Sequence, residues 1–382
     1  MAFEESSSIT SHSSITDSGQ DIDQFESTIS SFLSKYPPDA VFLAAVSGGA
    51  DSMAMLAALS AVAHKERLYC LHVEHGIRQP EESKGDADFV RDYCQKHGIE
   101  CRVISIPPGK ITSFARRKGA GIEAAARFFR RKALFSEAEK FGENARILIA
   151  HTKDDMLETA LMRVLRGCGP AGLAAMPAEN RVNSKEQRII LRPMSSLERV
   201  DVINYLKAKG ISWREDSTNA DEKFLRNRVR RQLVPLLNDA FPSWKTGISC
   251  MAETQSLAAD FITEEAKKRI SWNYENNILS SSDSQFPAPS SRLSAPSVST
   301  NEEKFFKQPI IIREEALFLA IDEFLKSGNN MRTIKRSVLR QFCSGSAAAV
   351  DLGPARIRRE GGKVLLSKKQ KDFFESGLSL LI

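Results

Sequence analysis

The chain has 382 residues, 42% of them hydrophobic and 27% charged, a composition typical of soluble globular proteins. This length allows two or three domains, each large enough to bury a hydrophobic core of its own. No run of apolar residues approaches the roughly 18–20 that cross a bilayer, so the sequence predicts no membrane span.

The formal net charge of +6 is unevenly distributed along the chain. Residues 1–34 contain six acidic and no basic residues, so the remainder carries a net charge of +12. This serine-rich stretch lacks the apolar core of a secretory signal and is too acidic for an organellar transit peptide. We therefore predict a disordered acidic tail over residues 1–34. The basic remainder suits a polyanionic partner, although a solvated basic surface explains the charge equally well.

The six cysteines form no C-x-x-C pair. They are Cys70, Cys94, Cys101, Cys168, Cys250 and Cys343. This spacing argues against a zinc knuckle, an iron–sulfur cluster and a disulfide framework, and it indicates a reducing compartment. We therefore expect a cytoplasmic protein.

Strand-like and helix-like patterns alternate between residues 39 and 167. The strand-like runs are 40–46, 67–73, 100–106 and 146–151. The helix-like runs are 52–63, 82–97, 122–141 and 154–166, and glycine directly follows the last three. Apolar strands separated by helices are typical of an α/β fold with a doubly wound parallel sheet, which binds ligands at the carboxyl ends of its strands. We predict a catalytic domain of this kind over residues 35–240.

Beyond residue 190 the patterns are mainly helical. The predicted elements are helices over 195–209, 245–272, 314–325 and 333–343, and a hairpin of 355–360 with 363–367 around Gly361 and Gly362. Serine and proline dominate residues 280–300, which predicts a flexible linker. The expected order is therefore a helical connection over 241–279, the linker, and a smaller, mostly helical C-terminal domain over 301–382.

The first predicted strand runs directly into a glycine-rich loop and then into an alanine-rich helix. The loop consists of Ser47, Gly48, Gly49, Ala50, Asp51 and Ser52. Two adjacent glycines allow a tight turn whose backbone N–H groups converge on an anion, and the helix adds its unpaired N–H groups and positive dipole end. Asp51 lies where a phosphate-bound Mg²⁺ needs a carboxylate. An ordinary strand-to-helix turn is the alternative.

Two further clusters follow other predicted strands and should reach the same edge of the sheet. His75 and Arg78 follow the second strand, where we expect them to line a bound nucleotide. His151 and Asp155 follow the fourth strand, and Asp155 with Asp51 forms the predicted Mg²⁺ pair. Capping of the next helix is the alternative role for Asp155.

Arginines supply the remaining candidates. Arg127 is expected to orient a phosphate or to stabilise charge at it, and it completes a catalytic set with Asp51, His151 and Asp155. The residues expected to contact RNA phosphates are Arg130, Arg226, Arg228 and Arg230. On charge alone, a solvated basic face explains these arginines as well.

Five segments resemble those of the tRNA(Ile)-lysidine synthetases, a family of the ATP pyrophosphatase superfamily whose phosphate loop is called the PP-loop. The segments are SGGADS at 47–52, HVEHGIR at 72–78, GIEAAARFFR at 121–130, HTKDDMLET at 151–159 with Arg166-Gly167, and EDSTN at 215–219 with RNRVR at 226–230. The resemblance covers residues 39–237 well and the C-terminal part loosely. Glu74 stands where the family usually has Asp, and Arg131 where it has Tyr.

This resemblance implies an ATP- and Mg²⁺-dependent ligase that forms a C–N bond. Its implied substrates are free L-lysine and the isoleucine tRNA with a CAU anticodon. ATP adenylates O2 of the wobble cytidine with release of pyrophosphate, and the lysine ε-amine then displaces AMP from C2 to leave lysidine. Codon reading changes from AUG to AUA, and the C-terminal region is expected to hold the tRNA.

Two rival functions remain at this point. A tRNA thiolase shares the same loop, but the lack of paired cysteines disfavours it. A catalytically silent tRNA-binding protein is the rival from another class. The oligomeric state stays open, with a homodimer as one option.

Overall fold

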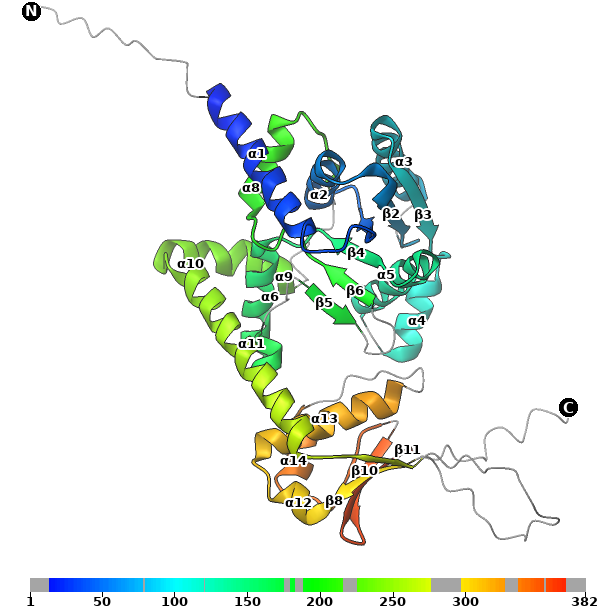
Figure 1. Cartoon of the computed structure of the whole chain (residues 1–382), viewed down its shortest axis with the longest axis vertical. Coiled ribbons are helices and arrows are strands. Elements are labelled where there is room, and N and C mark those ends of the chain that lie inside the picture. The colour runs from blue at the N-terminus through cyan, green and yellow to red at the C-terminus, as the bar shows by residue number, and fades with distance from the viewer. Residues whose placement is uncertain are drawn as a thin grey trace, which may run out of the picture. The chain divides into compact units, whose positions relative to one another are not determined.

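The computed structural model describes most of the chain. The described residues are 14–77, 80–119, 121–174, 179–182, 188–215, 225–275, 297–326, 336–353 and 355–368. The chain divides into two compact units, Met1–Glu253 and Thr254–Ile382, and helix α11 (Trp244–Arg269) contributes residues to both (Figure 1). None of the described helices combines the length and the apolar character needed to cross a membrane.

The first unit is built on a six-stranded sheet. Its strands are β1 (Val41–Ala45), β2 (Leu68–Glu74), β3 (Glu100–Ser105), β4 (Ala145–Ile149), β5 (Glu179–Val182) and β6 (Arg188–Leu191). In the order β3-β2-β1-β4-β6-β5, all neighbours run parallel except β5, which lies antiparallel to β6 at the edge. This order confirms the predicted doubly wound sheet and adds the β5–β6 pair, which the sequence patterns do not predict.

Helices cover both faces of this sheet. The α-helices of this unit before α11 are α1 (Ser14–Leu33), α2 (Ala50–Val62), α3 (Pro80–His97), α4 (Lys110–Lys118), α5 (Ile122–Ala138), α6 (Lys153–Arg166), α7 (Pro170–Leu173), α8 (Arg199–Ala208), α9 (Leu225–Arg228) and α10 (Val234–Ala240). Successive side chains of β1 point to opposite faces. Phe42 and Ala44 therefore enter one core with α1, α2, α3 and α8, whereas Leu43 enters a second core with Leu134 of α5. Burial on both sides explains why β1 is apolar throughout.

Helix α1 corrects the prediction of a disordered tail over residues 1–34. Residues 14–33 are helical, and the helix packs on α2 and α8 (Figure 1). Phe25 and Ile29 are fully buried, and the Phe25 ring stacks on Tyr205 with a centroid distance of 4.3 Å. These apolar side chains recur at helical spacing on one face, so a docked helix forms although the segment is acidic and rich in serine. The rest of the predicted tail, residues 1–13, lies outside the described residues.

Replacing Phe25 by alanine tests this docking. The substitution removes a buried ring and leaves a cavity against Tyr205, so we expect the free energy of unfolding to fall by about 3–5 kcal/mol. Denaturant unfolding followed by circular dichroism measures the change. Phe241→Ala is the matched control because its side chain is 61% exposed. Equal and small losses in both variants would mean that α1 does not contribute to the core in solution.

The second unit contains an antiparallel sheet beside its helices. Its elements are β7 (Asn273–Glu275), β8 (Ser297–Asn301), α12 (Glu302–Phe306), α13 (Ile310–Lys326), α14 (Arg336–Cys343), β9 (Ala349–Asp351), β10 (Ala355–Glu360) and β11 (Lys363–Lys368). The strand order is β7-β8-β11-β10-β9. Phe305, Leu317, Phe342 and Ile357 belong to a core shared by the helices and the sheet. The predicted helical content is confirmed, and the sheet extends well beyond the single hairpin expected.

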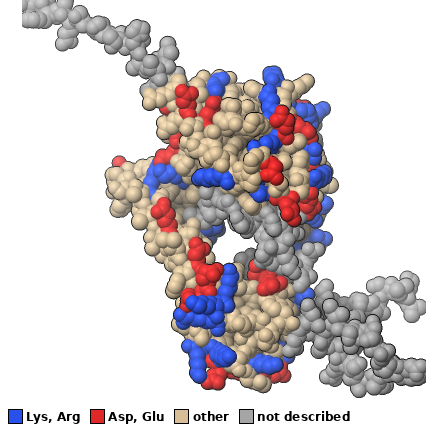
Figure 2. All heavy atoms as spheres, viewed as in Figure 1, with Lys and Arg blue, Asp and Glu red and all other residues tan. Residues whose placement is uncertain are grey.

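The predicted hairpin is present, because Glu360 pairs with Lys363 across Gly361 and Gly362, which both have positive φ. The predicted linker over 280–300 is wrong at its end, since residues 297–300 belong to β8 and pair with β11. Residues 280–296 lie outside the described part. On the face shown in Figure 2, acidic and basic side chains are mixed over both units. Charge alone therefore singles out no partner surface on that face.

Candidate active site

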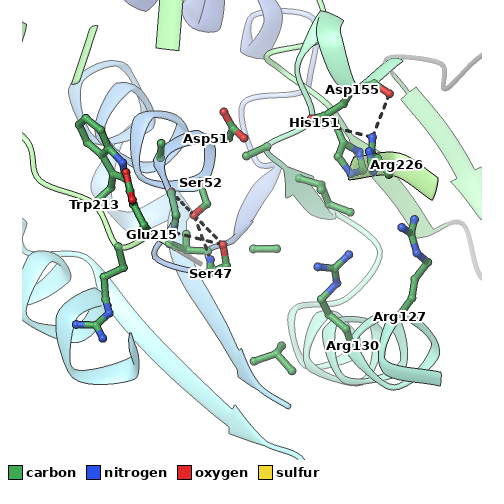
Figure 3. A pocket seen from close by; sticks show the side chains of 18 of the residues that line it. Ser47, Asp51, Ser52, Arg127, Arg130, His151, Asp155, Trp213, Glu215 and Arg226 are labelled. Carbon is green, nitrogen blue, oxygen red and sulfur yellow. Dashed lines mark hydrogen bonds and ion pairs between the residues drawn. The ribbon is translucent and has the colours of Figure 1, made fainter. Parts of the chain in front are cut away.

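A cavity of about 920 Å³ opens at the carboxyl ends of β1, β2 and β4 in the first unit. The loop after β1, His75 after β2 and His151 after β4 all line it. The strand order changes direction between β1 and β4, and such a switch point is where α/β sheets bind ligands. In Figure 3 the glycine-rich loop faces Arg127 and Arg130 on α5. The cavity therefore brings together the clusters predicted from three separate strand ends.

The glycine-rich loop has the shape of a phosphate cradle. Gly48 has a φ of +92°, a conformation that favours glycine, and its carbonyl accepts a hydrogen bond from Arg214 N at 3.0 Å. Ser52 Oγ donates to Gly49 O at 2.9 Å and accepts from Ser47 N at 3.2 Å. No described side chain caps the start of α2. Its first N–H groups can therefore serve an anion.

Asp51 lies on the first turn of α2 and lines the cavity. Its Oδ2 pairs with Arg199, whereas Oδ1 is buried and has no hydrogen-bond partner among the described residues. Burial raises the pKa of Asp51, Arg199 opposes the rise, and the charge of Asp155 adds to it. An unpaired, buried carboxylate oxygen close to a second carboxylate is a donor set that suits a hard cation such as Mg²⁺.

Asp155 combines the two roles weighed from the sequence. It belongs to a capping box at the start of α6, in which Thr152 N donates to its Oδ2 at 3.0 Å. Its other oxygen, Oδ1, accepts hydrogen bonds from Arg226 at 3.2 Å and from Arg230 at 3.3 Å. The capping alternative is thus present in the structure, and it leaves one carboxylate oxygen facing the arginines of the cavity.

Glu158 holds the same two arginines from the next turn of α6. Its carboxylate is buried and accepts hydrogen bonds from Arg226 Nε at 2.9 Å and from Arg230 Nη2 at 3.0 Å. Arg226 and Arg230, predicted to contact RNA phosphates, therefore line the cavity and are paired with Glu158 and Asp155, and the contact of Arg226 with Asp155 can be followed in Figure 3. Arg228, between them in the sequence, is exposed and does not line the cavity. We call Asp155, Glu158, Arg226 and Arg230 the carboxylate–arginine cluster.

Helix α5 adds two arginines on the opposite wall. Arg127 is 56% exposed and approaches Glu123 at 3.7 Å, so it remains largely hydrated at the cavity mouth. Burial lowers the pKa of Arg130, and the charge of Arg127 lowers it further. Two guanidinium groups that repel each other in this way form a site that an anion would stabilise. Both residues face the loop that follows β1.

His151 is held in its neutral form. Arg192 Nε donates a hydrogen bond to His151 Nδ1 at 3.2 Å, which requires that nitrogen to be an acceptor. Burial lowers the pKa of His151 to about 4, Asp155 opposes this, and Arg192 adds to it. Near neutral pH, His151 can therefore position a group by hydrogen bonding but does not carry a positive charge.

Several residues that line the cavity have no signal in the sequence. Arg199 begins α8 and reaches Asp51 from 148 residues away along the chain. Trp213, Arg214 and Glu215 approach from the segment after α8. Glu215 is the exception among these four residues, because it begins the fifth segment that resembles the lysidine synthetases. The predicted nucleotide residue Arg78 lies outside the described residues, as do residues 216–219.

Comparison with known proteins adds to this geometry. A model of the PP-loop domain family matches residues 22–237. The tRNA(Ile)-lysidine synthase of Treponema denticola is 37% identical over 60% of this chain and 49% of its own length, and that of Solibacter usitatus is 37% identical over 58% and 44%. The chain thus spans about half the length of the curated relatives it matches. The match to the PP-loop domain model covers the cavity residues on α2, α5 and α6.

Among solved structures, the U34-tRNA thiolase NcsA from Methanococcus maripaludis, which carries a [4Fe-4S] cluster, superposes with a TM-score of 0.50. The match covers 62% of this chain and 80% of that one, at 16% sequence identity. At this identity the likeness concerns the fold alone.

Proposed function

The chain belongs to the PP-loop domain family, and from this premise we propose that it ligates free L-lysine to C2 of the wobble cytidine in the isoleucine tRNA with a CAU anticodon. ATP adenylates the cytidine, and the products are lysidine, AMP and pyrophosphate. The change converts an anticodon that reads AUG into one that reads AUA. The reaction is placed in the cytoplasm, in keeping with the free thiols of the described cysteines.

One observation carries the proposal most directly. A phosphate cradle, two acidic residues and several arginines line a single cavity at the switch point of the sheet. The PP-loop domain model spans the segments that build this cavity, and relatives named tRNA(Ile)-lysidine synthase match more than half of the chain. A silent tRNA-binding protein would have no need for a buried carboxylate oxygen without a partner beside a phosphate cradle.

The residues present fit a magnesium ion. Asp51 Oδ1 is buried without a described partner, and Asp155 is close enough to raise the pKa of Asp51. Both carboxylates would hold Mg²⁺, which would neutralise charge on the phosphates and on the departing pyrophosphate. Arg199 already pairs with Oδ2 of Asp51. Asp51 and Asp155 therefore do not bury two uncompensated negative charges.

The first step transfers AMP to the RNA. The N–H groups at the start of α2 and the hydroxyls of Ser47 and Ser52 would hold the phosphate chain. Cytidine O2 attacks the α-phosphorus, the bond to the bridging oxygen breaks, and pyrophosphate leaves. Arg127 and Arg130, opposite the loop, would stabilise the negative charge that develops on the α-phosphate.

The second step replaces the oxygen by nitrogen. The ε-amine of lysine attacks C2 as the neutral base, the C2–O bond breaks, and AMP carries the electron pair away while the amine loses its proton. Adenylation is needed because the carbonyl oxygen alone is a poor leaving group. Neutral His151 can hydrogen-bond within the cavity without adding a charge that would repel an approaching ammonium group.

The second unit is proposed to contact the tRNA outside the anticodon. Arg356 lies exposed on β10, and Arg340 on α14 is 68% exposed although it pairs with Glu314. Exposed arginines of this kind bind phosphates without reading sequence. Their contribution should therefore appear as a salt-dependent part of the tRNA affinity.

Purified chain, ATP, Mg²⁺, lysine and an unmodified tRNA transcript provide the test of the reaction. Adenylation alone releases one pyrophosphate per bound tRNA, so sustained release over many turnovers is expected to require both lysine and the CAU anticodon. A transcript altered only at the wobble base is the matched control. Release that is equally fast without lysine and with sulfide would support a thiolase instead. The structure disfavours that rival, because none of the six cysteines lines the cavity within the described residues.

A further inference from the structure

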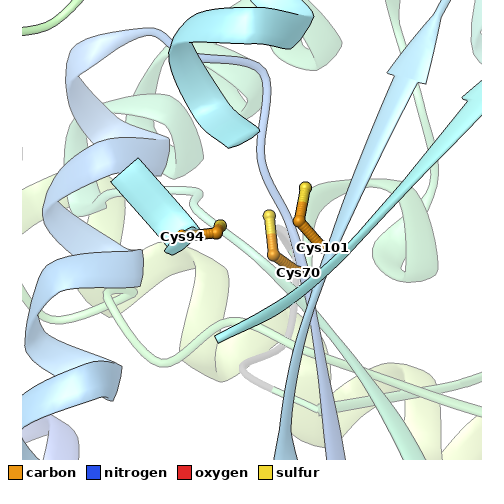
Figure 4. A group of neighbouring side chains, drawn as sticks. All are labelled: Cys70, Cys94 and Cys101. Atoms are coloured by element: carbon orange, nitrogen blue, oxygen red, sulfur yellow. The ribbon is translucent and has the colours of Figure 1, made fainter. Parts of the chain in front are cut away.

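Three cysteines that are scattered in the sequence meet inside the first unit. Cys70 on β2 and Cys101 on β3 are direct neighbours in the strand register, and Cys94 projects toward them from α3 (Figure 4). Their Sγ atoms all lie within 4.8 Å of one another. Cys70 and Cys94 are fully buried, whereas Cys101 is only partly buried. We call these three residues the cysteine triad.

The proposed ligation does not use the cysteine triad. Cys70 and Cys101 lie in the first halves of β2 and β3, whereas the cavity opens where the parallel strands end. Cys94 lies in the last turn of α3, which ends just before β3 begins. None of the three lines the cavity. A role for them must therefore be independent of the reaction at the phosphate cradle.

The geometry suits a metal ion better than a disulfide. A Zn–S bond of about 2.3 Å in tetrahedral geometry places sulfurs about 3.8 Å apart, so small side-chain rotations would bring all three thiolates onto one ion. A disulfide would join only two of the sulfurs and would leave the third thiol without a covalent or metal partner. Cys101 is only partly buried, so an ion could reach the site from its side, and water would supply the fourth ligand of a tetrahedral Zn²⁺.

Charge favours a divalent ion in this environment. Three thiolates around a monovalent ion would leave a net charge of −2 in a largely apolar core, whereas a divalent ion leaves −1. Thiolates are soft ligands that prefer Zn²⁺ to Mg²⁺ or Ca²⁺. The lack of a C-x-x-C pair does not exclude this site, because its ligands come from three different elements.

We propose that Cys70, Cys94 and Cys101 bind one thiophilic divalent cation such as Zn²⁺. The bound ion ties α3 to the β2–β3 side of the sheet. Helix α3 also supports the phosphate cradle, since a Cβ on Gly48 would lie 3.6 Å from Val90 and 3.8 Å from Phe89. A bound ion should therefore stabilise the part of α3 that packs against Gly48 of the glycine-rich loop.

The test uses the full chain, purified under reducing conditions and stripped with a chelator. Titration with Co²⁺ alone is expected to produce a thiolate-to-cobalt charge-transfer band that saturates at one ion per chain and disappears when Zn²⁺ is added. Cys94→Ser should abolish the band and weaken Zn²⁺ binding by more than the roughly 10–100-fold cost of losing an outer-shell partner. Cys343→Ser, which changes a buried cysteine of the second unit, is the matched control and should keep the band.

A second measurement needs no variant. Zn²⁺ should protect Cys101 from alkylation, while the exposed Cys168 and Cys250 stay reactive in the same molecule. No charge-transfer band at saturating Co²⁺, or a band that persists in Cys94→Ser, would overturn the proposal. Recovery of a disulfide between two members of the cysteine triad, without metal uptake, would overturn it in favour of a redox pair.

Discussion

Replacing Asp51 by asparagine is expected to lower the turnover of lysine-dependent pyrophosphate release on the order of 10²–10³-fold. The substitution keeps the size of the side chain but removes the negative charge next to the phosphate cradle. It also leaves Arg199 without its charged partner and Asp155 as the remaining carboxylate of the predicted Mg²⁺ pair. Steady-state kinetics with ATP, lysine and tRNA, together with a tRNA-binding measurement, would show the effect.

The affinity for tRNA should change little in this variant, because Asp51 is placed at the ATP phosphates and not on the RNA. Asp88→Asn is the matched control, since Asp88 is a half-exposed residue of α3 paired with Arg91 on its own helix. Wild-type turnover in Asp51→Asn would remove Asp51 from the predicted Mg²⁺ pair. Lost tRNA affinity with unchanged turnover at saturating tRNA would move it from the ATP site to the RNA site.

Replacing Glu158 by glutamine is expected to lower turnover roughly 10²-fold, because Arg226 and Arg230 lose the shared carboxylate that positions them in the cavity. The protein should also lose stability, at the lower end of the ~3–5 kcal/mol cost of breaking a buried ion pair, since both arginines are partly solvated. Turnover and the unfolding midpoint would be measured on the same preparation.

Glu123→Gln is the matched control for this change. Glu123 also faces an arginine, but its side chain is 65% exposed and its contact with Arg127 is 3.7 Å long. The control should keep the stability of the wild type. If Glu158→Gln instead kept its turnover and lost tRNA affinity, Arg226 and Arg230 would serve the RNA, as the sequence alone suggests.

Helix α1 shows where composition misleads. Residues 1–34 are acidic and rich in serine, which favours disorder, yet Phe25 and Ile29 are buried against α2 and α8. A few apolar side chains at helical spacing are enough when a complementary core exists. The PP-loop domain match, which begins at residue 22, also includes the second half of this helix.

The carboxylate–arginine cluster joins residues whose proximity cannot be predicted from the sequence. Arg226 and Glu158 are 68 residues apart along the chain, and no local pattern indicates that they meet. The sequence predicts RNA phosphate contacts for Arg226 and Arg230, because clustered positive charge has the same signature for any polyanion, and this stays a prediction. The fold brings them to the carboxylates of α6.

The glycine-rich loop and the alternating α/β fold can be predicted from the amino-acid sequence, because both depend on residues adjacent in the chain: glycines in a turn, apolar strands, and helices that begin or end at recognisable residues. Which charges pair in the cavity, the place of α1 in the core, and the meeting of Cys70, Cys94 and Cys101 become visible in the folded molecule alone. These features join side chains from separate elements. Their proximity follows from how the strands are ordered in the sheet and how the helices pack on it, which short-range patterns do not encode.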